Sequence, residues 1–540
     1  MSGSNCAVSN KSRWCVAALF GLNAAVSPSP PLSLWAQTAS RSCEDLRAVA
    51  LVDATVTGAE IQPAGTFTPP LGAALQVPKP FCRVSLTAKP SPSSDIRIEV
   101  WLPLPSDWNG RFWGVGNSGY TGRVWYTRLA AHVDAGYVAV SSDGGHQSSG
   151  GDKSWARAQP EKVVDFLHRS AHLSAVHGKR IATEFYGRAP ARAYFSGFST
   201  GGHEGLMLAQ RYPDDYDGIV AGAANQDWTN LYLGIARFQF NWLSDPARFV
   251  SPAQLAALHL AAVATCGAAD LIEEPDRCDV EAVLRAYQPS DTAPALTASQ
   301  LASVRALYTG PVGLDGQVMT RLGYVPGSEA LWSGMHFGTT PGKGPLVGYM
   351  TEFLANWVYD DPAWDHRSFD FARDAAATNR KLAATMNATD ADLRPFAKRG
   401  GRLILYNGWD DPAVPARLTL DYYQRVMSTL GVETAAQHVR LFMVPGMGHS
   451  TGGPGFTQFG QLAPGNGDPE RSMSAALQRW VEQDVAPERI IGAKHANPSD
   501  PTSDVLRTRP LCAWPYVAGY GGGGSADDAT NYACTGPRPR

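Results

Sequence analysis

Tyr194-Phe195-Ser196-Gly197-Phe198-Ser199-Thr200-Gly201-Gly202 contains the pattern Gly-x-Ser-x-Gly between a strand-like run and the helix-like residues 203–212. A chain that turns sharply from strand to helix strains the backbone of the serine, and side chains at the flanking positions would clash across the turn. Glycines are therefore expected there. This arrangement is typical of a nucleophile elbow, and it predicts that Ser199 is a nucleophile.

A second match to the pattern, Gly448-His449-Ser450-Thr451-Gly452, lacks this context. The residues after it, Gly453-Pro454-Gly455, cannot open a helix. We therefore interpret Ser450 as a chance match.

A serine hydroxyl needs a base within hydrogen-bond reach and a carboxylate that orients this base. Strand-like residues 402–406 lead into a loop with Asp410 and Asp411, and strand-like residues 439–444 lead into His449. Serine, acid and histidine follow one another in this order in the α/β-hydrolase fold. His449 is thus the predicted base, whereas spacing leaves open which aspartate orients it.

Other candidates for these roles have simpler explanations. Asp410 could be a solvated turn residue, or a cap on the helix that follows Pro415. His203 lies in the first turn of the elbow helix and is expected to be structural. His146 precedes Ser199, which is the wrong order for this fold.

Alternating strand-like and helix-like segments extend the prediction to a catalytic domain of residues 40–225 and 395–540. Strand-like segments are residues 96–102, 112–115, 137–141 and 193–195, and helix-like segments are residues 163–185, 416–430 and 470–485. Such alternation is typical of a mostly parallel sheet. We expect an α/β-hydrolase fold, with a loop-like tail that includes residues 521–524.

Residues 226–394 interrupt this alternation with an irregular, aromatic-rich segment. We predict that they form an inserted lid domain, which would set substrate specificity. Each aromatic side chain is expected to fill the lid's own core rather than a pocket. The aromatic residues are Trp228, Tyr232, Phe238, Phe240, Trp242, Trp332, Phe337, Tyr349, Phe353, Trp357, Tyr359 and Trp364.

Residues 1–39 are predicted to be a signal peptide and leader, because Lys11 and Arg13 precede the apolar residues 14–26. A secreted or periplasmic protein is therefore expected. The rest of the chain has six cysteines, an even number that favours disulfides. Their grouping suggests the pairs Cys43–Cys82, Cys266–Cys278 and Cys512–Cys534, although fifteen pairings are formally possible.

The formal net charge of −3 over 540 residues argues against nucleic acid or an anionic membrane surface as a partner. No stretch beyond the leader is predicted to span a membrane. The expected partner is a small, largely uncharged molecule, and no catalytic cofactor or metal is expected.

Further motifs are spread along nearly the whole mature chain. They are Trp108-Asn109-Gly110-Arg111-Phe112-Trp113-Gly114-Val115-Gly116-Asn117, Ser142-Asp143-Gly144-Gly145-His146-Gln147, Ser154-Trp155-Ala156, Pro160-Glu161-Lys162-Val163-Val164-Asp165-Phe166, Gly408-Trp409-Asp410-Asp411-Pro412, Gly446-Met447-Gly448-His449 and Arg509-Pro510-Leu511-Cys512. With the elbow, these motifs resemble the tannase and feruloyl esterase family, which includes mono-hydroxyethyl terephthalate hydrolases. In the family the acid loop reads Gly-Trp-Ala-Asp with the last residue catalytic, so the resemblance selects Asp411.

The resemblance implies a serine esterase that acts on aromatic, phenolic carboxylic esters such as feruloyl or galloyl esters, through an acyl-enzyme on Ser199. A terephthalate mono-ester is the alternative substrate. Two further alternatives are a catalytically silent hydrolase-like binding protein and a peptidase on the same fold. A complete set of serine, aspartate and histidine argues against the silent protein.

Two features depart from the family pattern. Family members carry a cysteine just before the nucleophile and another just after the catalytic histidine, and the two form a disulfide; here Phe198 and Ser450 stand at these positions. Packing and the bond between Asp411 and His449 must therefore hold the triad. The family's structural calcium binds an aspartate-rich lid loop, but residues 267–277 keep few aspartates. Because calcium prefers six to eight oxygen ligands, we expect the ion to be lost.

On this fold the oxyanion hole combines the N–H group after the nucleophile, here that of Thr200, with one from a glycine-rich loop after an early strand. Gly116-Asn117-Ser118-Gly119 follows the strand-like residues 112–115. We predict Gly119 as the second donor, with Ser118 as the alternative. The competing interpretation of this loop is a plain tight turn.

Overall fold

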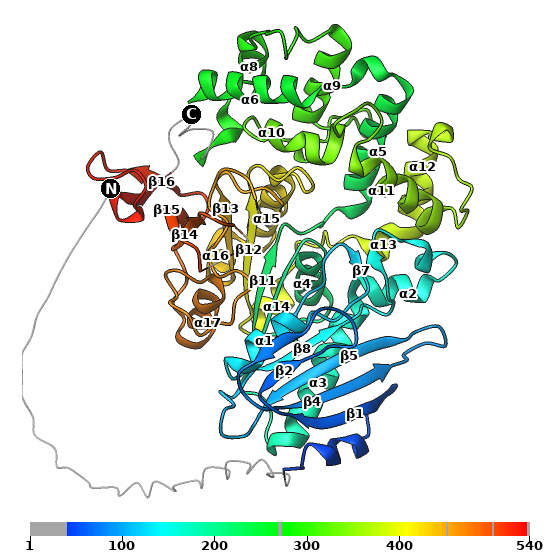
Figure 1. Cartoon of the computed structure of the whole chain (residues 1–540), viewed down its shortest axis with the longest axis vertical. Helices are drawn as coiled ribbons and strands as arrows, with labels where there is room; N and C mark the ends of the chain where they lie inside the picture. The colour runs from blue at the N-terminus through cyan, green and yellow to red at the C-terminus, as the bar shows by residue number, and fades with distance from the viewer. Residues whose placement is uncertain (1–39, 268–272, 450–451, 499, 501, 537–540) are drawn as a thin grey trace, which may run out of the picture. The chain divides into compact units, whose positions relative to one another are not determined.

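A nine-stranded sheet runs through the described part of the chain in the order β1-β4-β5-β8-β6-β10-β11-β12-β13 (Figure 1). Its strands are β1 (Ala54–Gln62), β4 (Phe81–Ala88), β5 (Ile96–Pro103), β6 (Arg111–Val115), β8 (Val138–Ser142), β10 (Arg192–Phe198), β11 (Gly218–Gly222), β12 (Arg402–Gly408) and β13 (Val439–Val444). The structure is a computed structural model that describes residues 40–267, 273–449, 452–498, 500 and 502–536. The predicted leader lies outside these residues.

Strand direction divides the sheet into two parts. From β8 to β13 each neighbouring pair is parallel, whereas β1, β4, β5 and β8 pair antiparallel. All five residues of β11 are buried, as expected for a parallel strand with both faces covered. The prediction of an α/β fold with a mostly parallel sheet is confirmed.

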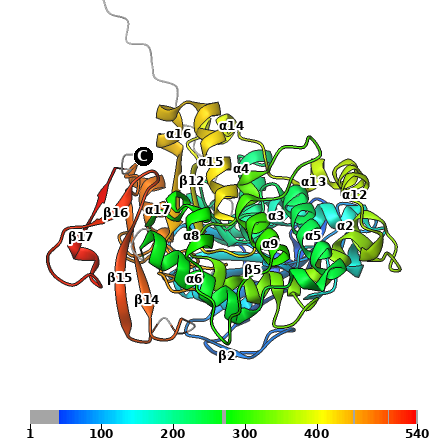
Figure 2. The ribbon, with the colours of Figure 1, turned by 90° about the horizontal axis from the view of Figure 1, so that it is seen from above.

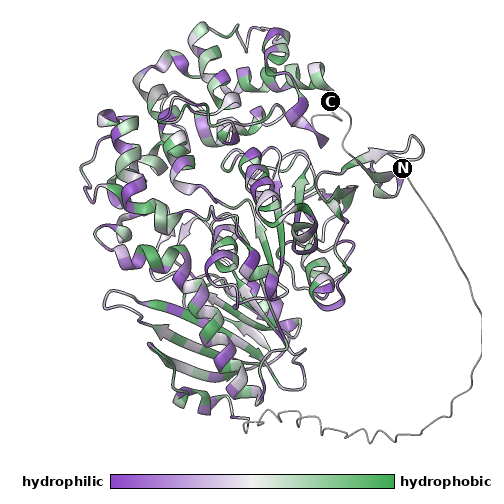
Figure 3. Cartoon of the chain, turned by 180° about the vertical axis from the view of Figure 1, so that it is seen from behind, coloured by the Kyte–Doolittle hydropathy of each residue, from purple (hydrophilic) through white to green (hydrophobic). Residues whose placement is uncertain are grey.

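Helices from both ends of the chain cover this sheet. They are α1 (Tyr126–Asp134), α2 (Pro160–Val164), α3 (Ser170–Tyr186), α4 (Thr200–Arg211), α14 (Arg394–Lys398), α15 (Ala416–Leu430), α16 (Val432–His438) and α17 (Met473–Gln483). Figure 3 shows green and purple residues alternating along many helices of the chain, as expected for helices with one apolar face. The predicted helix of residues 416–430 coincides with α15.

The segment between β11 and α14 is helical. Its helices are α5 (Trp228–Ser244), α6 (Pro252–Cys266), α8 (Val280–Ala286), α9 (Ala298–Thr309), α10 (Glu329–Trp332), α11 (Pro345–Phe353), α12 (Phe371–Thr378) and α13 (Ala384–Met386). Figure 1 shows α6, α8, α9 and α10 gathered together in green. Trp332 and Phe337 lie in an apolar cluster formed by this segment alone.

Other aromatic residues of the segment do not lie in a separate core. Trp228, Tyr232 and Trp357 share a cluster with Tyr120 and Phe166, which precede this segment in the chain. The expectation that each aromatic fills the lid's own core is therefore wrong for these residues, because their rings pack across to the body. The side chain of Trp242 is not described.

Pro246–Cys266 is long and apolar enough to cross a membrane by length and composition, which is weak evidence for a span. In the structure α6 begins with a capping box between Ser251 and Gln254. Leu255, Leu258 and other residues of this helix are buried in the cluster of the lid segment. About a third of the most apolar window of this segment, 33%, is buried in the structure.

The C-terminal tail forms two ribbons, so the prediction of a loop-like tail is wrong. β14 (Arg489–His495) pairs with β15 (Val505–Cys512), and β16 (Val517–Tyr520) pairs with β17 (Tyr532–Thr535) (Figure 2). Residues 521–524 lie in the loop between β16 and β17. These two strands have only four residues each, which is too short for a clear alternation of apolar and polar residues in the sequence. The three predicted disulfides, Cys43–Cys82, Cys266–Cys278 and Cys512–Cys534, are confirmed.

Candidate active site

Ser199 lies at the turn between β10 and α4 with a backbone φ of 56°. A β-carbon at Gly197 would lie 2.4 Å from the carbonyl carbon of Gly201, and one at Gly201 would lie 2.6 Å from the Asn117 oxygen. Any larger residue at either position would therefore push the turn apart. The steric reason predicted for the glycines holds in the structure.

The imidazole of His449 joins the two other predicted site residues. The Ser199 hydroxyl lies 2.9 Å from Nε2 of His449, and Nδ1 of the same ring lies 2.8 Å from Oδ2 of Asp411. Because Nδ1–H donates to the carboxylate, Nε2 is left as the acceptor for the serine proton. The structure thus brings together three residues that are up to 250 positions apart in the chain.

Asp411 and Asp410 have different surroundings. Oδ1 of Asp411 accepts hydrogen bonds from the amides of Ala413 and Val414, which leaves Oδ2 for His449. Asp410 is 4% exposed, and α15 has no side-chain cap. Both simpler explanations of Asp410, a solvated turn residue and a helix cap, are therefore wrong.

The surroundings of Asp410 disfavour the charged form of its carboxyl. Burial, and then the negative charge of Glu329, raise the pKa of Asp410 well above its ordinary value, and His259 offsets only part of this effect. A carboxyl whose charged form is disfavoured is a poorer partner for an imidazolium than a stable carboxylate. Geometry and charge therefore both favour Asp411 as the partner of His449.

The pKa of His449 is raised above its ordinary value. Burial alone would lower it, but the charge of Asp411 and the hydrogen bond to Asp411 outweigh burial. The protonated ring is therefore stabilised, as a general base requires when it has taken up a proton.

A stack of side chains supports His449 where the family has its disulfide. The ring of Phe198 meets the imidazole edge-on, with centroids 6.4 Å apart. The guanidinium of Arg128 lies 5.4 Å from the centroid of Phe198 and 4.7 Å from that of Trp125. Sequence reasoning missed Arg128, whose sequence position gives no sign of this contact. Ser450, the other position of the family's disulfide, lies outside the described residues.

The glycine-rich loop reaches the elbow as predicted. The Thr200 hydroxyl donates to the carbonyl of Gly119 at 2.7 Å. The backbone N–H of Asn117 donates to Oε2 of Glu204 at 2.8 Å, so the elbow helix anchors the loop. The carbonyl of Ser118, the residue predicted as the alternative donor, accepts from the Thr121 hydroxyl. Glu204 is a further residue that sequence reasoning missed.

His336 ties the lid segment to the acid loop, because its Nε2 lies 2.8 Å from the carbonyl of Pro412. The two weaker histidine candidates lie elsewhere. His203 contacts the carbonyl of Asn225, and His146 stacks on Trp155 and contacts the carbonyl of Tyr120. Burial lowers the pKa of His203 to about 3 and that of His146 to about 4. Both rings are therefore neutral structural groups.

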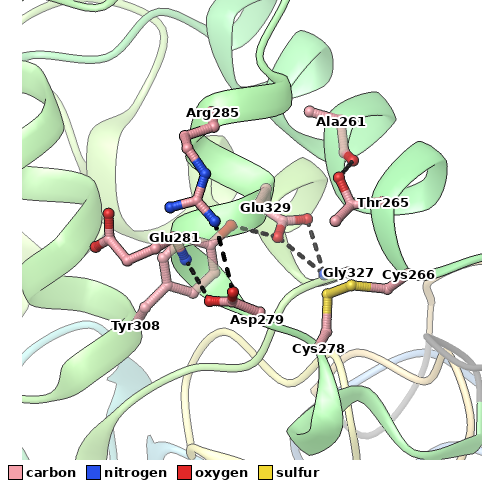
Figure 4. Close-up of a disulfide and its surroundings, with 10 residues drawn as sticks. All are labelled: Ala261, Thr265, Cys266, Cys278, Asp279, Glu281, Arg285, Tyr308, Gly327 and Glu329. Carbon is pink, nitrogen blue, oxygen red and sulfur yellow. Dashed lines mark hydrogen bonds and ion pairs between the residues drawn. A yellow bond between two sulfur atoms is a disulfide. The ribbon is translucent and has the colours of Figure 1, made fainter.

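Acidic side chains near the disulfide Cys266–Cys278 are bound by protein donors. Figure 4 shows Asp279 accepting from the amide of Glu281 and facing Arg285, at 2.9 Å and 3.7 Å. Between the two cysteines, Glu273 lies 2.8 Å from Arg509, and Asp276 lies 2.5 Å from Arg417.

These contacts do not fit the family's calcium, which would need six to eight oxygen ligands free of opposing cations. Within the residues that the structure describes, no three His, Cys, Asp or Glu side chains are grouped to hold a metal. Asp270, on the same loop, lies outside the described residues.

Comparison with known proteins gives consistent results along the chain. The family model described as tannase and feruloyl esterase matches residues 82–535. An uncharacterized esterase of Xanthomonas campestris pv. campestris is 37% identical over 93% of this chain and 92% of that protein. A probable feruloyl esterase B-2 of Aspergillus terreus is 34% identical over 84% of this chain and 86% of that protein.

Two solved structures share the fold. The crystal structure of feruloyl esterase B from Aspergillus oryzae has a TM-score of 0.82 and 29% identity, over 91% of this chain and 99% of that chain. A tannin acyl hydrolase from Aspergillus niger has a TM-score of 0.70 and 19% identity, over 89% of this chain and 92% of that chain.

We expect Asp411→Asn to lower the pKa of His449 below its ordinary value of about 6.5, because burial then acts without the opposing charge. Asp410→Asn should leave this pKa almost unchanged, since burial and Asp411, and not Asp410, are what shift the pKa of His449. A titration of the His449 ring by NMR measures both. Equal shifts in the two variants would contradict the assignment of Asp411.

Removal of metal should leave the protein unchanged, because arginines or backbone donors already bind the described acids near the disulfide. We expect no bound calcium by elemental analysis of protein prepared without chelator, and melting temperatures within about 1 °C with and without chelator. One tightly bound calcium per chain would show that residues of the loop such as Asp270 supply ligands.

Proposed function

Because the chain belongs to the tannase and feruloyl esterase family and is a carboxylic ester hydrolase, we propose that it cleaves aromatic esters through an acyl-enzyme on Ser199. The observation that carries this proposal is the imidazole of His449 between Ser199 and Asp411, with both contacts below 3.0 Å. The preferred substrates are phenolic esters such as feruloyl or galloyl esters. The resemblance seen in the motifs is confirmed as family membership.

The geometry leads to a two-step reaction. The Ser199 oxygen attacks the ester carbonyl carbon while its proton passes to Nε2 of His449, and Asp411 stabilises the resulting imidazolium. His449 returns the proton to the alcohol oxygen as the C–O bond breaks, which leaves the acyl group on Ser199. Water, deprotonated by His449, then releases the carboxylic acid and restores the serine.

Backbone donors around Ser199 would stabilise the negative charge on the ester oxygen. Thr200 opens α4, so its N–H group has no partner within the helix. The Thr200 hydroxyl donates a hydrogen bond to the Gly119 carbonyl, which holds the backbone of Gly119 next to Thr200. These contacts support the two amides as the oxyanion hole.

Residues 226–394 serve in this proposal as a lid over the acyl site, and residues 1–39 direct export. The contact between His336 and Pro412 supports the lid, because it joins this segment to the acid loop. Three disulfides support export, since such bonds persist in oxidising compartments.

Ser199→Ala should abolish hydrolysis of methyl ferulate, with a fall of at least about 10⁴-fold in kcat, because the attacking oxygen is lost. Ser450→Ala, the matched control, should lose less than about 10-fold. Assays with methyl ferulate, methyl gallate and mono-hydroxyethyl terephthalate identify the acyl group in the same experiment. Similar losses in both variants would mean that Ser199 is not the nucleophile.

Gly119→Val should lower kcat by about 10²-fold, the scale of one lost oxyanion donor. Gly119 has a φ of 58°, and no atom lies within 4 Å of a β-carbon built there, so backbone strain rather than a clash moves the amide. Gly523→Val is the control, because that position has an ordinary φ and open space. An unchanged kcat in folded Gly119→Val protein would place the second donor on another residue.

A further inference from the structure

Lys153 is buried beside aromatic rings and has no carboxylate within ion-pair distance in the described part of the chain, although the charges of Glu352 and Asp152 act on it. Its side chain is 1% exposed, and its ammonium makes one hydrogen bond, 3.3 Å to the Gly151 carbonyl, and no ion pair within the described part of the chain. The ammonium lies 3.7 Å from the ring centroid of Tyr349 and 4.8 Å from that of Tyr120. Burial lowers the pKa of Lys153 to about 8. A cation is rarely buried in this way unless it has a polar partner.

Further donors surround the same rings. Tyr120 contacts Tyr349 and Trp228, with centroids 5.4 and 6.0 Å apart. The Tyr120 hydroxyl and the Trp228 Nε1–H are buried and make no hydrogen bond of ordinary length among the described residues, although they lie close enough to each other and to Tyr232 for weak polar contacts. Burial raises the pKa of Tyr120, so its hydroxyl keeps its proton and can donate.

This donor cluster lies next to the proposed oxyanion loop. Tyr120 directly follows Gly119, whose carbonyl accepts from Thr200, the residue after the nucleophile. On the other side, Val414 of the acid loop packs in the same apolar cluster as Tyr120 and Trp228. Aromatic walls with a few unpaired donors are typical of a site for an aromatic ligand that carries polar groups.

We propose that Lys153, Tyr120 and Trp228 form a subsite for an oxygen substituent on the ring of the aromatic acyl group. The inference rests on the proposed function and deepens it, because it names the part of the substrate that is recognised. All three groups donate hydrogen bonds, so the ligand atom is an acceptor oxygen. A phenol oxygen and the free carboxylate of a terephthalate mono-ester both supply this chemistry.

The test compares esters that differ only in the ring oxygen. Methyl ferulate is paired with methyl cinnamate, and mono-methyl terephthalate with methyl benzoate. The variants are Lys153→Met, which keeps the length of the side chain, and Tyr120→Phe, which removes only the hydroxyl. Lys343→Met is the matched control, because Lys343 is an exposed lysine shortly before α11.

We expect the wild-type protein to prefer the ring-oxygen ester of at least one pair. Lys153→Met should reduce this preference, as a ratio of kcat/KM values, by about 10- to 100-fold, the scale of a hydrogen bond to a charged group. Tyr120→Phe should reduce it less, and Lys343→Met should not change it. The pair that shows the effect identifies the oxygen as a phenol or a carboxylate.

Equal losses on both members of each pair would overturn the subsite and show that Lys153 only supports the fold. If Lys153→Met does not fold, the same ratios for Tyr120→Phe decide the question. Hydrolysis of p-nitrophenyl butyrate separates the two proposals. A wild-type protein that cleaves this ester and none of the aromatic esters would overturn the proposed function, and the subsite with it.

Discussion

The backbone of Ser199, held at a positive φ, is the constraint on which the rest of the site depends. At this turn the elbow, the end of β11 and the loop at Asn117 lie so close together that only glycine fits at the contact positions. A β-carbon at Gly202 would lie 2.2 Å from the Gly222 carbonyl at the end of β11, and one at Gly201 would meet the loop at Asn117. This close packing fixes the turn against the sheet, so packing in the core offsets the backbone strain at Ser199.

With the serine placed by the sheet, its partners come from loops that follow β12 and β13. These loops are held by local bonds rather than by the disulfide that the family has at this place. Two backbone amides fix the carboxylate of Asp411, and His336 holds the next carbonyl along the loop. Phe198, backed by Arg128, packs against the imidazole. Packing and hydrogen bonds thus take the place of a covalent link.

Much of this arrangement could be predicted. The strands around the elbow, the helix of residues 416–430 and the three disulfides follow from apolar runs, turn residues and cysteine grouping. The strands of the tail could not be predicted, because β16 and β17 are short and pair only with each other. Asp410 was also misinterpreted, since the charges that act on its carboxyl, those of Glu329 and His259, come from residues far away in the chain.

The sequence by itself determined the α/β class and the nucleophile elbow, and it made Ser199, Asp411 and His449 the candidates for the site. These features depend on local turn chemistry and on the order of residues in the chain. Only the tertiary structure decided which atoms meet. It distinguished the two adjacent aspartates by charge and hydrogen bonding, and it placed Arg128 behind Phe198 and Lys153 beside Tyr120. The physical reason is that burial and electrostatic environment arise from segments distant in sequence, which no local pattern records.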